Sequence, residues 1–118
     1  MADETKSELS LVLAAAAARS LAAARRKGFV RPASPENDGE TVALMHSELS
    51  EVLEAIRTDG YRRRSDHVPE ISAVAEEYAD LIIRVLGACA AHGIDIGTAI
   101  EAKMAFNEGR PYRHGKKF

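Results

Sequence analysis

Two short acidic motifs carry the strongest chemical signal in this chain of 118 residues. Glu48 and Glu51 are three residues apart, and so are Glu77 and Asp80. On a helix this spacing places both carboxylates on nearly the same face, one turn apart. Four carboxylates brought together by two paired helices repel one another unless a cation lies between them. Oxygen ligands of this kind suit Mg²⁺, with Mn²⁺ as a possible substitute.

The same motifs allow a second interpretation, a solvated acidic face. Carboxylates at this spacing are common on helix surfaces, and these could pair with Arg57, Arg84 or Lys103 instead of a metal. No histidine completes the Glu-x-x-His spacing of carboxylate-bridged di-iron bundles, since His46 lies only two residues before Glu48. The spacing therefore argues against a redox metal and leaves the magnesium site and the solvated face as alternatives.

Basic and polar side chains gather towards the C-terminus. Lys103 and Asn107 share a helix face at four-residue spacing, and Arg110, Tyr112 and Lys116 follow them. A metal beside clustered Lys and Arg suits polyphosphate chemistry, because the ion bridges phosphate oxygens while the basic groups take the remaining charge. The alternative is a disordered basic tail, which is common at chain ends. The tyrosine and its neighbouring proline favour a segment that docks.

Helices are predicted to position these residues. The first is expected to begin near Thr5, which has the capping-box spacing to Glu8, and to stop at Gly28. A loop over residues 31–39 follows, and Asn37 or Asp38 is expected to cap a second helix that ends near residue 57. This second helix carries the first acidic motif.

The second acidic motif falls on a third predicted helix. Pro69 fits its first turn, and Gly93 is its stop. Asp95 with Thr98 has the spacing of a cap for a fourth helix. The three arginines at 62–64 are interpreted as part of a solvated, mobile linker, with a lid that reaches a phosphate as the weaker alternative. No segment alternates with period two, so the chain is predicted to be one all-α domain over residues 1–118, an antiparallel bundle of about four helices.

More apolar residues occur than one small bundle can bury. Leu44 and Ala55 lie beside the face of the first acidic motif, and Ile83 lies away from the main apolar stripe of its helix. We therefore expect homo-oligomerisation to complete the bundle, because a partner would cover the excess.

Composition restricts the partners and the compartment. A net charge of −2 gives no general reason to expect nucleic-acid binding. The apolar stretch 9–18 follows more acidic than basic residues, against the pattern of a secretory signal, and Arg19 interrupts it before it could span a membrane. The acidic residues that precede it are Asp3, Glu4 and Glu8. The single cysteine, Cys89, is compatible with a reducing compartment. We expect a soluble cytoplasmic protein with neither nucleic acid nor membrane as a partner.

Four segments together carry a family resemblance. They are HSELSEVLEAIR at 46–57, EEYAD at 76–80, KMAFN at 103–107 and RPYRHGKK at 110–117. In this order and separation they resemble MazG-type proteins of the all-α nucleoside triphosphate pyrophosphatase superfamily. The resemblance covers roughly residues 9–118. It implies antiparallel helices assembled into a dimer or tetramer, with Mg²⁺-dependent cleavage of a nucleoside triphosphate between the α- and β-phosphates.

The resemblance also assigns roles by position. It implies that the metal ligands are Glu48, Glu51, Glu77 and Asp80, and that the phosphates or sugar are contacted by Lys103, Asn107, Arg110, Tyr112 and Lys116. Glu51 could also orient the attacking water. Ser47 departs from the family, which often has a second glutamate there, and this affects hydrogen bonding around the ligands or the number of metal ions. Phe29 could stack on a base, although an anchor in the core is the favoured interpretation.

Two other functions remain open at this stage. One is a catalytically silent helical oligomer that binds nucleotides or a protein partner, which the extra apolar faces and Ser47 motivate. The other stays within the superfamily and is a phosphoribosyl-ATP pyrophosphohydrolase. The C-terminal segment fits the MazG type better.

Overall fold

The computed structural model of the protein describes residues 5–118, so that Asp3 and Glu4 lie outside the described residues. Four α-helices follow one another: α1 (Glu8–Arg26), α2 (Pro35–Arg57), α3 (Ala73–Ala91) and α4 (Ile96–Glu108). A short 3-10 helix, η1 (Tyr112–Gly115), ends the chain. Over residues 5–118 the only β-type pairing is an isolated bridge between Arg64 and Ser72. The prediction of an all-α protein is confirmed.

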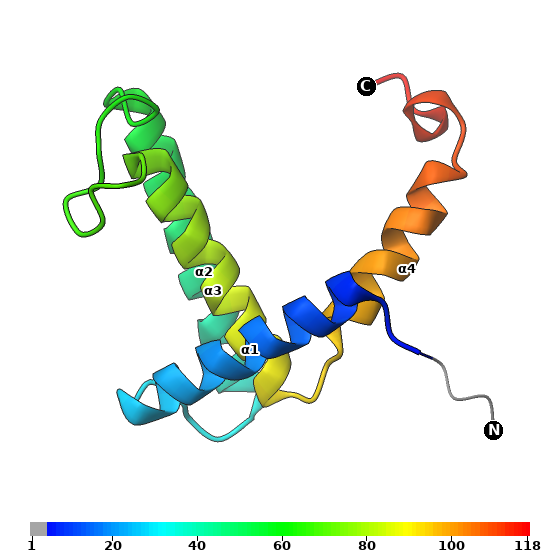
Figure 1. Ribbon diagram of the computed structural model, residues 1–118, viewed down its shortest axis with the longest axis horizontal. Helices are drawn as coiled ribbons and strands as arrows, with labels where there is room; N and C mark the ends of the chain where they lie inside the picture. Colours follow the sequence, from blue (N-terminus) through cyan, green and yellow to red (C-terminus); the bar gives the residue numbers. More distant parts are fainter. Residues whose placement is uncertain (1–4) are drawn as a thin grey trace.

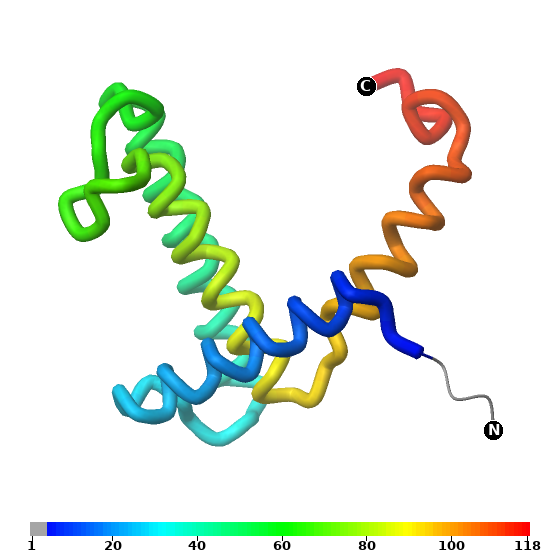
Figure 2. The backbone as a smooth tube through the Cα atoms, in the orientation of Figure 1, coloured from blue at the N-terminus to red at the C-terminus, as the bar shows by residue number. Residues whose placement is uncertain are grey.

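The helices form two arms joined by α1 (Figure 1). In one arm α2 and α3 lie side by side and antiparallel. Helix α1 packs across α3, and α4 packs mainly on α1 and leaves in another direction, at 112° to α3. Figure 2 shows the C-terminal segment well separated from the α2–α3 arm. The two arms hold the two groups of residues that the sequence predicts to form one site.

Serine hydroxyls determine where three of the helices begin. The side chains of Ser7, Ser34 and Ser72 accept hydrogen bonds from backbone N–H groups three residues later, at 3.0, 3.0 and 3.1 Å. Such caps satisfy N–H groups that have no partner inside the helix. The cap predicted for α4 is confirmed, because the Asp95 carboxylate accepts from the Thr98 N–H at 3.1 Å.

The other predicted helix starts were wrong. Thr5 lies before the cap of α1, because the nearer hydroxyl of Ser7 takes that role. Helix α2 begins at Pro35, so Asn37 and Asp38 lie within its first turn. Pro69 lies in the loop before α3 and not in its first turn.

The three arginines at 62–64 are exposed, as expected for a solvated loop, and the loop before α3 also hydrogen-bonds back to the helices. Ser65 is buried, and its hydroxyl accepts from the N–H groups of His67 and Val68 at 3.2 and 3.0 Å. The Ala73 N–H donates to the Arg63 carbonyl at 2.8 Å. These bonds fix the loop against the start of α3, near the acidic residues of that helix.

Small residues let α4 cross α1 closely. A Cβ on Gly97 would lie 2.7 Å from the Ser10 carbonyl oxygen, so no larger residue fits there. The hydroxyls of Ser10 and Thr98 are 3.1 Å apart, and the Ser7 hydroxyl donates to Glu101. This crossing sets the direction of α4.

The core is small and lies along both sides of α3. Its buried apolar residues are Ala17 and Leu21 of α1, Val52 and Ala55 of α2, and Ala73, Val74 and Leu86 of α3. No single helix in residues 5–118 is long and apolar enough to cross a membrane, and only α3 and α4 taken together as a bent pair pass that test.

Candidate metal centre

Three carboxylates meet between α2 and α3. Glu48 of α2 and Glu77 and Asp80 of α3 each offer an oxygen, and these oxygens lie within 4.8 Å of one another. We call these three residues the acidic cluster. Glu48 and Glu77 are half-buried and Asp80 is exposed. The antiparallel pairing of α2 and α3 thus brings three of the four predicted ligands together.

Glu51 lies outside the acidic cluster. It is one turn beyond Glu48 on α2 and exposed. Its charge nevertheless reaches the cluster, because it is among the carboxylates that raise the pKa of Glu77. The structure therefore places the four predicted ligands as a group of three with one neighbour.

The acidic cluster is electrostatically unfavourable without a cation. Burial, followed by the charges of Asp80, Glu76, Glu51 and Glu48, raises the pKa of Glu77. Burial and the charges of Glu48 and Glu76 likewise raise the pKa of Asp80. Both shifts mean that the ionised forms are disfavoured here. A divalent cation would relieve this repulsion.

The donor set fits a magnesium ion. Magnesium is held by one or two carboxylates and by substrate phosphates, and it keeps several waters. Three carboxylate oxygens within 4.8 Å can converge on one ion by small side-chain rotations and leave other positions for water or phosphate. Mn²⁺ accepts the same ligands.

Two charged neighbours border the acidic cluster. The Arg84 Nε donates to Glu48 Oε1 at 2.8 Å. The His67 Nδ1 and Glu76 Oε1 atoms are 2.7 Å apart, and this contact raises the pKa of His67 and lowers that of Glu76. Sequence reasoning considered Arg84 only as a partner in a solvated face and did not single out the His67–Glu76 pair. Its two residues are nine positions apart and on different elements, so no spacing pattern connects them.

The predicted substrate-binding residues lie on the other arm. Lys103 and Asn107 belong to α4, Arg110 follows it, Tyr112 opens η1 and Lys116 lies beyond. This segment is separated from α2 and α3 within the chain (Figures 1 and 2). The structure thus brings these residues near one another but not to the acidic cluster.

Lys103 of α4 and Arg110, just after it, lie on the exposed aromatic ring of Phe106, which sequence reasoning missed. Lys103 Nζ lies 4.5 Å from the centre of the Phe106 ring, and Arg110 Cζ lies 5.7 Å from it. The Asn107 Oδ1 atom is buried without a hydrogen-bond partner among the described residues. For residues 5–118, no carboxylate forms an ion pair with Lys103 or Arg110. The cations of this arm are therefore available to an external anion.

Phe29 and Ser47 both lie away from the acidic cluster's hydrogen bonds. The favoured interpretation of Phe29 as a core anchor was wrong, because its side chain is 80% exposed. The Ser47 hydroxyl lies 3.5 Å from the Ala43 carbonyl of its own helix. It therefore turns to the backbone and makes no hydrogen bond to the acidic cluster.

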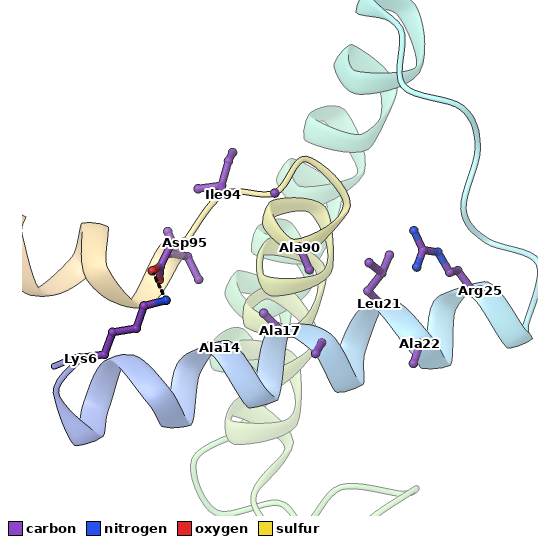
Figure 3. A pocket seen from close by; sticks show the side chains of 12 residues that line it. Lys6, Ala14, Ala17, Leu21, Ala22, Arg25, Ala90, Ile94 and Asp95 are labelled. Atoms are coloured by element: carbon purple, nitrogen blue, oxygen red, sulfur yellow. Dashed lines mark ion pairs between the residues drawn. The ribbon is translucent and has the colours of Figure 1, made fainter. Parts of the chain in front are cut away.

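A separate hollow of about 400 Å³ lies between α1 and the connection from α3 to α4. Figure 3 shows its lining of small apolar side chains, with the Lys6–Asp95 ion pair at one end and Arg25 at the other. Hydrogen bonds from Lys6 and Thr98 lower the pKa of Asp95 to about 2. None of the predicted site residues lines this hollow, so it adds nothing to the metal centre.

Comparisons with protein-family models, with curated proteins and with solved structures found no match for this chain. The functional inference therefore comes from the chain's own residues. The most informative are the three carboxylates on one arm and, on the other, the cations that form no ion pair within residues 5–118.

Proposed function

We propose that this protein is a MazG-like, Mg²⁺-dependent nucleoside triphosphate pyrophosphohydrolase. It would cleave the bond between the α- and β-phosphates of an NTP or dNTP and release a monophosphate and pyrophosphate. The observation that carries the proposal is the acidic cluster, because the two motifs named by the family resemblance supply its three carboxylates. The single thiol, Cys89, is compatible with a reducing compartment, and we extend the proposal to the cytoplasm.

The chain's own residues would divide the work. Glu48, Glu77 and Asp80 would hold Mg²⁺, which, when bound, neutralises phosphate charge and makes water more acidic. Glu51 is free of the cluster, and its carboxylate would accept a hydrogen bond from the attacking water and orient it. Pyrophosphate would leave towards basic side chains that balance its charge.

Those basic side chains would come from a second copy of the chain. In one chain α4 leads away from the acidic cluster (Figure 1). The accessible surface is 9071 Å², whereas a compact monomer of 12.8 kDa exposes about 6,300 Å². The radius of gyration is 16.9 Å, against about 13.5 Å for a compact domain of this length. The excess surface is about 2,800 Å² per chain, or about 5,600 Å² for two copies, which is in the upper range of the total area that obligate homodimers bury.

Exposed apolar side chains support the same assembly. On α2 and α3 they are Val42, Leu44, Leu49, Leu53, Ile56, Tyr78, Ile82 and Ile83. Exposed apolar residues in this number on a small domain suit a protein interface. A second copy is the occupant that also explains the charges, because its cationic arm complements the acidic cluster. We therefore propose a homo-oligomer, a dimer or a tetramer.

The test is pyrophosphate release from a panel of NTPs, dNTPs and phosphoribosyl-ATP with Mg²⁺ or Mn²⁺. Asp80→Asn is the control for the metal site, and products must be identified as monophosphate plus pyrophosphate. If no substrate is turned over faster by the wild type than by this variant, the proposal is wrong. Turnover of phosphoribosyl-ATP alone would replace it with the narrower activity.

The separation of the arms favours one other candidate, a catalytically silent helical oligomer that binds nucleotides or a protein. Such a protein would not need the cations beside the acidic cluster. Calorimetry distinguishes the two functions. Nucleotide binding without any product would support the silent oligomer.

A further inference from the structure

Arg84 connects the acidic cluster to a permanent positive charge. It lies on α3 one turn after Asp80, and its Nε donates to the Glu48 carboxylate of α2 at 2.8 Å. The Glu48 side chain is 18% exposed and that of Arg84 is 46% exposed. The contact therefore joins a half-buried metal-ligand candidate to a side chain that reaches the solvent.

Most of the guanidinium group remains unused. Arginine has five N–H donors, and its charge persists throughout the physiological pH range. Within residues 5–118 the bond to Glu48 is the only hydrogen bond or ion pair of the Arg84 side chain. Both terminal nitrogens are thus available to a ligand.

The charge of Arg84 also acts on the rest of the acidic cluster. It opposes the carboxylates that raise the pKa of Asp80. It must equally repel any divalent ion that the cluster binds, because like charges at short range oppose one another. One residue thus both compensates the acids and competes with their metal.

We propose that Arg84 binds the substrate phosphates and thereby makes ion binding depend on the substrate. In the metal-free protein it neutralises part of the cluster through Glu48 and weakens the binding of a lone divalent ion. When a triphosphate arrives with the ion, the free N–H donors bind its phosphate oxygens, for which the planar fork of arginine is well suited. The inference rests on the proposed function, since it assumes that a polyphosphate reaches this cluster.

A purely structural role for Arg84 makes the opposite prediction. If the arginine only orients Glu48, its loss should weaken metal binding by about 10- to 100-fold, as for other residues that support ligands. If it competes with the ion, its loss should strengthen metal binding. The sign of the change separates the two roles.

The experiment measures Mn²⁺ binding by electron paramagnetic resonance, first alone and then with inorganic tripolyphosphate as the probe. For Arg84→Gln we expect Mn²⁺ alone to bind about tenfold tighter, from the loss of a nearby like charge. We expect tripolyphosphate with Mn²⁺ to bind about tenfold weaker, from the loss of charge-assisted hydrogen bonds. Arg19→Gln on α1, exposed and outside the cluster, removes the same charge and should change neither value.

Arg84→Lys provides a second variant in case the glutamine variant does not fold. It keeps the charge but loses the planar fork, so Mn²⁺ alone should bind within about twofold of wild type while tripolyphosphate binds weaker. Weaker or unchanged binding of Mn²⁺ alone by Arg84→Gln would overturn the proposal, and so would a wild type that binds no Mn²⁺ even with tripolyphosphate present. Stronger Mn²⁺ binding without any pyrophosphate release would support it while contradicting the proposed hydrolysis.

Discussion

Neutralising Asp80 should stabilise the metal-free protein. Its carboxylate faces those of Glu48 and Glu77 within 4.8 Å, and each such pair repels by about 0.9 kcal/mol at the dielectric constant of water. The dielectric constant of water is the appropriate one because Asp80 is exposed to solvent. Asp80→Asn removes about 2 kcal/mol of repulsion and about 1 kcal/mol of attraction to Arg84. The net gain is about 1 kcal/mol in the free energy of unfolding, or about 4 °C in Tm.

In saturating Mg²⁺ the wild type should instead be more stable than Asp80→Asn. At a hundredfold excess over its Kd, an ion bound only by the folded state adds about 2.7 kcal/mol, which is about 10 °C in Tm for the wild type. Asp80→Asn lacks one ligand and should lose most of that gain. Thermal unfolding followed by circular dichroism, in EDTA and in saturating Mg²⁺, measures both effects. Glu54→Gln removes an exposed carboxylate of α2 outside the acidic cluster and should shift neither Tm by more than about 2 °C. The reasoning is refuted if Asp80→Asn melts below the wild type in EDTA, or if it keeps the full response to Mg²⁺.

Three further predictions concern pH, the α1–α4 crossing and assembly. Because the folded-state pKa values of Glu77 and Asp80 are raised, these two groups bind more protons in the folded than in the unfolded state, so their contribution to metal-free stability should fall as pH rises through those values. Urea unfolding in EDTA from about pH 4 to pH 7 checks this. The double variant Glu77→Gln/Asp80→Asn should lose this contribution to the pH dependence of the free energy of unfolding. Gly97→Ala would place a Cβ 2.7 Å from a carbonyl oxygen of α1, so we expect a loss of about 1–3 kcal/mol in unfolding experiments, whereas an unchanged stability would mean that the crossing opens freely. Mixing inactive Asp80→Asn with inactive Lys103→Ala should restore about a quarter of the wild-type pyrophosphate release in a dimer with shared sites, and no recovery after subunit exchange would exclude that sharing.

The sequence predicted features that depend on local spacing. The i,i+3 carboxylates of α3 lie on one face because helix geometry alone requires it, and the Asp95–Thr98 cap spans three residues. Local patterns did not predict the correct helix cap where several neighbouring residues had suitable side chains. Thr5 and Ser7 both carry hydroxyls, and the helix uses Ser7, whose hydroxyl also donates to Glu101 of α4.

Contacts between residues far apart in the chain could not be predicted from these local patterns. The direction of α4 depends on the close contact of Gly97 with Ser10, two residues far apart in the chain. Neither residue has a spacing that signals the contact. The lone bond from Arg84 to Glu48 likewise depends on the register between α2 and α3. Sequence reasoning therefore found the carboxylates but not the cation that borders them.

The arrangement of the arms makes the charges of this site interdependent. The chain's own cationic segment lies apart from the acidic cluster, so Arg84 is the one arginine or lysine hydrogen-bonded to a cluster carboxylate within residues 5–118. One positive charge cannot balance three carboxylates, and a single magnesium ion still leaves no surplus for a triphosphate. In the proposed homo-oligomer, a second copy would supply further cations on its α4. Ion, substrate and partner would then each strengthen the binding of the others, because each reduces a charge imbalance that the others leave.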